Sequence, residues 1–202
     1  MIDARLLPLQ HRLLAPPARL LTRLGVQADQ VTLTGFALGL LVLPSLWSGH
    51  HGLALLLIGL NRLADGLDGA LARLQGPTDR GAFLDIALDF LFYALVPLGF
   101  ALADPARNAL PAALLLTSFV GSGSSFLAFS VLAQKRGLTA ADYPSKGIAY
   151  LGGLTEGTET IAFFAAICLW PVAFPVLAYG FATAAFVTTL TRWIIGWQLL
   201  RP

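Results

Sequence analysis

The sequence predicts an all-α membrane protein, with six transmembrane helices preceded by an N-terminal amphipathic helix on the membrane surface. Of its 202 residues, 56% are hydrophobic and 12% are charged, whereas about 25% of the residues in a soluble domain are charged. The apolar residues form blocks of about 20, the length that crosses a bilayer. The positive charges lie between these blocks and form no basic stripe, so a lipid bilayer is the expected partner and no nucleic acid is expected.

The N-terminal residues 1–28 are predicted to form an interfacial helix and a linker. Leucines alternate with arginines at helical spacing between residues 4 and 24, which is typical of a helix lying in the plane of the membrane. The alternative is a helix packed on a protein partner.

Residues 29–202 are predicted to form the six-helix bundle, so that residues 1–202 make a single domain. The boundaries follow Gly, Pro and charged breaks between the apolar blocks. The predicted spans are 30–48, 52–74, 81–104, 109–134, 148–169 and 172–197.

The basic residues predict a cytoplasmic N-terminus and a cytoplasmic active face. Six spans place both termini on one side of the membrane. The loops predicted on the other side contain one basic residue, Arg107. The composition, rich in Ala and Leu, favours a bacterial inner membrane. The basic residues on the predicted inside are Arg5, Arg12, Arg19, Arg23, Arg80, Lys135, Arg136, Lys146 and Arg201.

Carboxylates lie in or beside the predicted spans, where each costs on the order of several kcal/mol unless it is compensated. Two aspartates are spaced i, i+3 on one predicted helix, and two are spaced i, i+4 on the next. A short connection joins these helices, so the four side chains are expected to face each other. Oxygen ligands without His or Cys favour Mg²⁺, Mn²⁺ or Ca²⁺. The carboxylates are Asp65, Asp68, Asp85, Asp89, Glu156 and Glu159.

The alternative for the four aspartates is a structural ion-pair cluster, which is disfavoured because too few basic residues are nearby to pair them. Gly69 and Ala72 keep the surface of their helix low, so that a bulky ligand can approach the backbone. Arg73 is a candidate clamp for diphosphate oxygens. The alternative for Arg73 is a side chain that snorkels to the membrane interface.

Residues 65–89 resemble the signature of the CDP-alcohol phosphotransferase family, D-x2-D-G-x2-A-R followed by G-x3-D-x3-D. Here the first half runs from Asp65 to Arg73 and the second comprises Gly81, Asp85 and Asp89, with a spacer at least one residue shorter than the pattern. The segment 25–32 is similar to the residues that precede the family's first span, with Ala28 and Asp29 in place of Pro and Asn.

This resemblance implies six transmembrane helices, a cytoplasmic amphipathic helix and a possible homodimer. The implied reaction transfers a phosphatidyl group from CDP-diacylglycerol to a hydroxyl acceptor and releases CMP, in phospholipid biosynthesis. Asp89 is the implied general base, and two Mg²⁺ or Mn²⁺ ions are expected. The implied metal ligands are Asp65, Asp68, Asp85 and Asp89, and the implied nucleotide and diphosphate contacts are Asp68, Gly69, Ala72, Arg73 and Gly81.

The acceptor and the donor remain open to alternatives. Glu156, Glu159 and Lys146 are candidate acceptor contacts, but the glutamates can instead face headgroup water, and the lysine can serve topology alone. The donor can also be a soluble CDP-alcohol whose acceptor is a lipid hydroxyl. A cation-coupled transporter would need inverted repeats, which the sequence lacks, and a cation channel leaves Gly69 and Arg73 unexplained.

Overall fold

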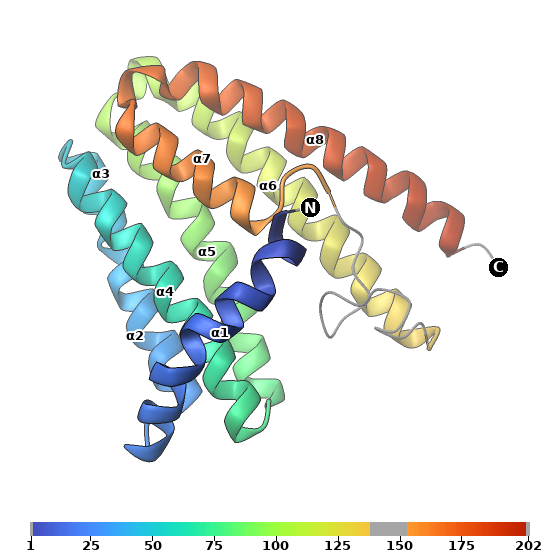
Figure 1. Ribbon diagram of the computed structural model, residues 1–202. Coiled ribbons are helices and arrows are strands. Elements are labelled where there is room, and N and C mark those ends of the chain that lie inside the picture. The colour runs from blue at the N-terminus through green and yellow to red at the C-terminus, as the bar shows by residue number, and fades with distance from the viewer. Residues whose placement is uncertain (1, 138–152, 201–202) are drawn as a thin grey trace.

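The structure, a computed structural model, describes residues 2–137 and 153–200, with the side chains of residues 1–9 and 11 undescribed. Every regular element in these ranges is helical, which confirms the predicted all-α class. In chain order the elements are α1 (Ile2–Arg23), α2 (Ala28–Leu40), α3 (Val42–Trp47), α4 (His51–Gln75), α5 (Asp79–Ala103), α6 (Pro105–Lys135), α7 (Gly157–Leu169), the 3₁₀ helix η2 (Pro171–Ala173) and α8 (Phe174–Leu199) (Figure 1).

Four helical segments of the described chain are long and apolar enough to cross a membrane. They are Ala28–Trp47, Asp79–Ala103, Pro105–Lys135 and Pro171–Leu199, each within a few residues of a predicted span. The predicted spans 52–74 and 148–169 are not among them. The first corresponds to α4, which has the length of α5 but carries its charged side chains in its middle and second half, whereas those of α5 lie in its first half. The second is represented by the 13 residues of α7.

The turn between α4 and α5 positions the predicted signature. Gly76, with φ of 95°, adopts a left-handed conformation that favours glycine, and it ends α4. Thr78 then caps α5, because its hydroxyl accepts a hydrogen bond from the Gly81 N–H at 3.0 Å. The two halves of the signature therefore lie on helices joined by a three-residue turn.

Helix α2 packs against both α4 and α5 (Figure 1). A Cβ atom on Gly35 would lie 2.5 Å from the Ala64 Cβ, so the glycine permits the close approach of α2 to α4. At the start of α2, the Gln75 side chain accepts from the Ala28 N–H at 3.2 Å and donates to the Val26 carbonyl at 2.7 Å. These bonds tie the beginning of α2 to the end of α4.

Helix α1 crosses α4 (Figure 1). Ala18 is fully buried in a small cluster with Ala70 and Leu71, whereas Leu13 and Leu20 are 66% and 58% exposed. One face of α1 thus packs on the chain's own α4 and another presents leucines outward. Its location at the membrane surface remains a prediction.

Candidate active site

Three of the four predicted metal ligands come together between α4 and α5. Carboxylate oxygens of Asp65, Asp85 and Asp89, one from each residue, lie within 4.8 Å of one another. The i, i+4 spacing places Asp85 and Asp89 on one face of α5, and the short turn brings that face opposite Asp65. We call these three residues with Asp68 the acid cluster.

Asp68 lines the same small pocket as the other three aspartates. Its side chain is buried, with 6% of its surface exposed, and Oδ2 has no hydrogen-bond partner among the residues that the structure describes. An unpartnered buried carboxylate oxygen is costly, and a bound cation would compensate it. The donor set contains oxygen alone, which suits Mg²⁺ or Mn²⁺. The acid cluster therefore fits a divalent metal.

A basic residue that sequence analysis missed lies within the acid cluster. Arg62 Nη2 is 2.6 Å from Asp89 Oδ1, and Arg62 Nη1 is 3.6 Å from Asp65 Oδ2. Arg62 thus pairs with two of the four aspartates, a contact that sequence analysis did not anticipate. Arg62 precedes Asp65 by three residues, and this spacing was the signal that could have found it.

A cavity of about 500 Å³ lies beside the acid cluster, between the start of α2 and the α4–α5 turn. Most of the predicted nucleotide contacts line it. Arg73 does not, but it lies on the exposed last turn of α4, with Nη1 3.5 Å from the position that a Cβ on Gly69 would take. We call this cavity the donor cleft. The predicted residues in its wall are Asp68, Gly69, Ala72, Gly81 and Asp85.

Asp29 and Arg80 form an ion pair in the wall of the donor cleft that sequence analysis did not anticipate. The Arg80 Nε and Nη2 atoms lie 2.8 Å and 2.6 Å from Asp29 Oδ2. Asp29 stands at the position of the Asn in the family pattern, at the start of α2. The pair links α2 to the first turn of α5 across the cleft.

A second cavity of about 500 Å³ lies among α5, α6, α7 and α8. Asp89 lines both this cavity and the pocket of the acid cluster, so it stands at the junction between them. Tyr93, Glu156 and Arg192 also line the second cavity, together with aromatic side chains of α5, α6 and α8. We call this space the junction cavity.

Of the predicted acceptor contacts, Glu156 lines the junction cavity and Glu159 does not. Both glutamates form a capping box at the start of α7, in which the carboxylate of each accepts from the backbone N–H of the other. Glu159 Oε2 lies 3.2 Å from the Glu156 nitrogen, and Glu156 Oε1 also accepts from Gly153 at 3.1 Å. Lys146 lies outside the described residues.

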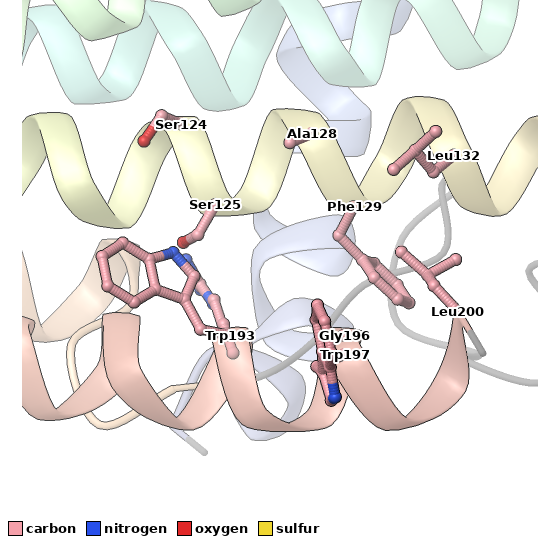
Figure 2. Close-up of a pocket in the computed structure, with 10 residues that line it drawn as sticks. Ser124, Ser125, Ala128, Phe129, Leu132, Trp193, Gly196, Trp197 and Leu200 are labelled. Carbon is pink, nitrogen blue, oxygen red and sulfur yellow. The ribbon is translucent and has the colours of Figure 1, made fainter.

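The groove in Figure 2, about 690 Å³ in volume, is larger than either of these cavities but is lined by no aspartate. It lies between the C-terminal halves of α6 and α8, and Ser125 and Phe129 point from α6 toward α8. Its walls are mostly apolar. The candidate site is therefore assigned from the acid cluster and not from the size of a cavity.

Comparison with known proteins gives a consistent result. Residues 26–198 match the sequence profile of CDP-alcohol phosphatidyltransferase. The Escherichia coli K12 inner membrane protein YnjF is 51% identical over 201 residues, which cover 100% of this chain and 98% of that protein. An archaetidylinositol phosphate synthase of Methanothermobacter thermautotrophicus is 27% identical over 200 residues, covering 96% and 93%.

The fold matches that of the Mycobacterium tuberculosis phosphatidylinositol phosphate synthase in two solved structures. The complex with manganese and citrate aligns with a TM-score of 0.71 and 26% identity, covering 91% of this chain and 88% of that one. The structure with CDP-DAG bound aligns with a TM-score of 0.73 and 24% identity, covering 92% and 94%.

The family profile spans most of the chain, which sets aside the transporter and channel alternatives. The apolar helices, together with a relative named as an inner membrane protein, support a bacterial integral membrane protein. The chain belongs to the CDP-alcohol phosphatidyltransferase family and is a membrane enzyme of that family.

Proposed function

We propose that this enzyme transfers a phosphatidyl group from CDP-diacylglycerol to a hydroxyl acceptor, with Mg²⁺ or Mn²⁺, and releases CMP. The observation that carries this proposal is the position of the acid cluster between two cavities. Asp85 lines the donor cleft and Asp89 lines the junction cavity, so a donor and an acceptor can meet at the carboxylates. The M. tuberculosis synthase, solved with CDP-DAG and with manganese, supports the same donor and metal class.

The four aspartates of the acid cluster are the proposed metal ligands, with two ions expected. The ions, when bound, supply positive charge that neutralises the diphosphate and the departing CMP. The Oδ2 of Asp68 supports this assignment, because a cation would satisfy a buried atom that no donor of residues 10–137 or 153–200 reaches.

The cytidine diphosphate end of the donor is proposed to occupy the donor cleft. Gly69, Ala72 and Gly81 leave room at its wall. Arg73, at the edge of the cleft beside Gly69, is placed to contact phosphate oxygens with its guanidinium. The acyl chains would remain in the bilayer while the nucleotide is held at the end of the helices.

Asp89 is the proposed general base. It would accept the proton of the acceptor hydroxyl, whose oxygen attacks the phosphorus that bears the diacylglycerol. A new P–O bond forms to the acceptor, the P–O bond to CMP breaks, and CMP leaves. The place of Asp89 at the junction of the two cavities supports this role.

The junction cavity is the proposed acceptor site. Glu156 is its predicted contact, because it lines this cavity in addition to capping α7. Glu159 would contribute by fixing the start of α7, and Lys146 remains a predicted contact. The proposed topology has six transmembrane helices, with α1 at the membrane interface and with the N-terminus and the active site on the cytoplasmic side. The homodimer stays a prediction.

The test is CMP release by the purified protein with CDP-diacylglycerol, Mg²⁺ or Mn²⁺ and a panel of hydroxyl acceptors. The panel contains glycerol 3-phosphate, an inositol phosphate, serine and choline. Asp89→Asn should lower acceptor-dependent CMP release by about 10²- to 10⁴-fold, the usual contribution of a general base. Asp79→Asn is the matched control, because Asp79 is exposed in the first turn of the same helix and lies outside both cavities.

Acceptor-dependent CMP that is lost in Asp89→Asn and kept in Asp79→Asn would establish the reaction and identify the acceptor. CMP formed only from a soluble CDP-alcohol with diacylglycerol would replace the proposed donor. Failure to bind any CDP-alcohol would refute the proposal.

A further inference from the structure

We propose that Arg62 is a positioning residue that holds Asp89 at the junction of the two cavities and competes with divalent cations for the acid cluster. This inference rests on the proposed function, since it concerns how Asp89 serves that reaction. Arg62 lies outside the nine-residue first half of the signature, three residues before it.

The first argument is that Arg62 bridges the two helices that carry the acid cluster. Its Nη2 atom lies 2.6 Å from Asp89 Oδ1 on α5, and its Nη1 atom lies 3.6 Å from Asp65 Oδ2 on its own helix, α4. The side chains of Arg62 and Asp89 are 15% and 31% exposed, so solvent screens their ion pair only in part. One oxygen of Asp89 is thereby held, and the proton transfer is assigned to its other oxygen.

The second argument is that Arg62 is itself held from several directions. Its Nε and Nη2 atoms donate to Asn61 Oδ1 at 2.8 Å and 2.6 Å. Asn61 Nδ2 in turn donates to the Gly35 carbonyl of α2 at 2.9 Å. The guanidinium lies over the rings of Phe92 and Tyr93, 4.6 Å and 5.4 Å from their centroids. Residues of α2, α4 and α5 thus fix one orientation of the guanidinium, as a positioning role requires.

The third argument is the charge of the cluster. Within the described part of the chain, Arg62 is the one basic residue in the wall of the pocket that contains the four aspartates. A fixed positive charge there offsets part of their repulsion, and it also repels an incoming divalent cation. Arg62 is therefore expected to weaken metal binding before the substrate arrives while it keeps Asp89 in place for the reaction.

Two substitutions separate these effects from a loss of folding. Arg62→Gln removes the charge, and should tighten Mn²⁺ binding by about five-fold or more because the repulsion is gone. The same change should lower kcat by about 100-fold, since a misplaced base loses most of its contribution, with the KM for the donor within three-fold. Arg62→Lys keeps the charge without the planar fork, so Mn²⁺ affinity should stay near wild type and kcat should partly recover.

The experiment measures Mn²⁺ binding to the full chain by electron paramagnetic resonance without substrate, and CMP release under saturating Mn²⁺. Thermal unfolding and gel filtration report on folding. Arg19→Gln is the control for a lost positive charge, because Arg19 is exposed on α1. It should change neither Mn²⁺ affinity nor kcat.

Tighter Mn²⁺ binding with a lower kcat in Arg62→Gln, and recovery of kcat in Arg62→Lys, would support the proposal. Unchanged or weaker Mn²⁺ binding in folded Arg62→Gln, or a kcat within three-fold of wild type, would overturn it. If Arg62→Gln does not fold, Arg62→Lys decides the positioning role. A kcat equal to wild type overturns that role, whereas a reduced kcat with normal Mn²⁺ affinity supports it. If the wild-type protein binds Mn²⁺ but forms no CMP, the proposed function is refuted. The Mn²⁺ affinities of wild type, Arg62→Gln and Arg62→Lys then still show whether Arg62 competes with the cation.

Discussion

Two pairs of carboxylates share the i, i+3 spacing in this protein but differ in their surroundings. Asp65 and Asp68 lie in the second half of α4, and Glu156 and Glu159 lie at the start of α7. The glutamate carboxylates accept hydrogen bonds from backbone N–H groups, including that of Gly153. The buried Asp68 has an oxygen without a partner in the described part of the chain, and Asp65 faces two further aspartates.

The difference teaches that spacing alone does not identify a metal site. The N-terminus of a helix offers unpaired N–H groups and a partial positive charge, so the glutamates are stabilised without a cation. The middle of a helix offers no free backbone donors, because each N–H is already bonded within the helix. Compensation of the aspartates of α4 is therefore assigned to Arg62, which lies 3.6 Å from Asp65, and to the proposed divalent ion.

The largest expected effect follows from removing the charge of Asp68. Asp68→Asn should lower CMP formation by about 10³-fold, because a lost metal ligand removes several kcal/mol of transition-state stabilisation. Without metal, Asp68→Asn should unfold at the same temperature as metal-free wild type or at a higher one. The reason is that the buried side chain, whose Oδ2 has no partner among the described residues, is no longer charged. A CMP assay and thermal unfolding in EDTA measure both quantities. Activity within ten-fold of wild type would exclude Asp68 from the metal site.

Metal addition should distinguish the acid cluster from the glutamate pair of α7 directly. Mn²⁺ at 100 times its Kd should stabilise the wild-type protein by about 2.7 kcal/mol, because the ion binds only the folded state. Asp85→Asn should lose most of this stabilisation, whereas Glu159→Gln should retain it. Thermal unfolding with and without Mn²⁺ gives the comparison. Equal losses in both variants would mean that the glutamates also hold metal.

Helix α4, which carries Asp65 and Asp68, should also differ from α7 because it leaves room for a ligand. Gly69→Ala should raise the KM for the donor by about ten-fold, roughly 1.4 kcal/mol of binding, without loss of stability. The new Cβ would meet only Arg73 Nη1, at 3.5 Å, which is an ordinary contact. Gly35→Ala is the contrasting variant, because its Cβ would lie 2.5 Å from Ala64 and should destabilise the fold. An unchanged KM in Gly69→Ala would remove Gly69 from the donor site.

The smallest effect is expected at the start of α7. Glu159→Ala should lower the free energy of unfolding by about 1 kcal/mol, the usual cost of a lost cap, and should change kcat less than three-fold. Glu159→Gln keeps an oxygen that can accept from the Glu156 N–H and should recover most of the stability. Chemical denaturation in detergent measures the difference. A loss of activity without a loss of stability would instead indicate acceptor contact.

The sequence by itself determined the helical class, the family and the residues of the acid cluster. Helical periodicity places Asp85 and Asp89 on one face, and the short α4–α5 turn brings that face opposite Asp65, so these carboxylates could be predicted to meet. The predicted boundaries of four spans lie within a few residues of the helices. The predicted span 52–74 corresponds to α4, whose charged residues, including the buried Asp68, separate it from the four apolar spans.

Only the tertiary structure decided how the remaining polar groups are satisfied. The contacts of Arg62 with Asp89 and of Asp29 with Arg80 join residues 27 and 51 positions apart. The bond from Asn61 to the Gly35 carbonyl depends likewise on the packing of α2 against α4. The physical reason is that spacing fixes the face of one helix on which a side chain lies, while the packing of several helices decides what that face meets.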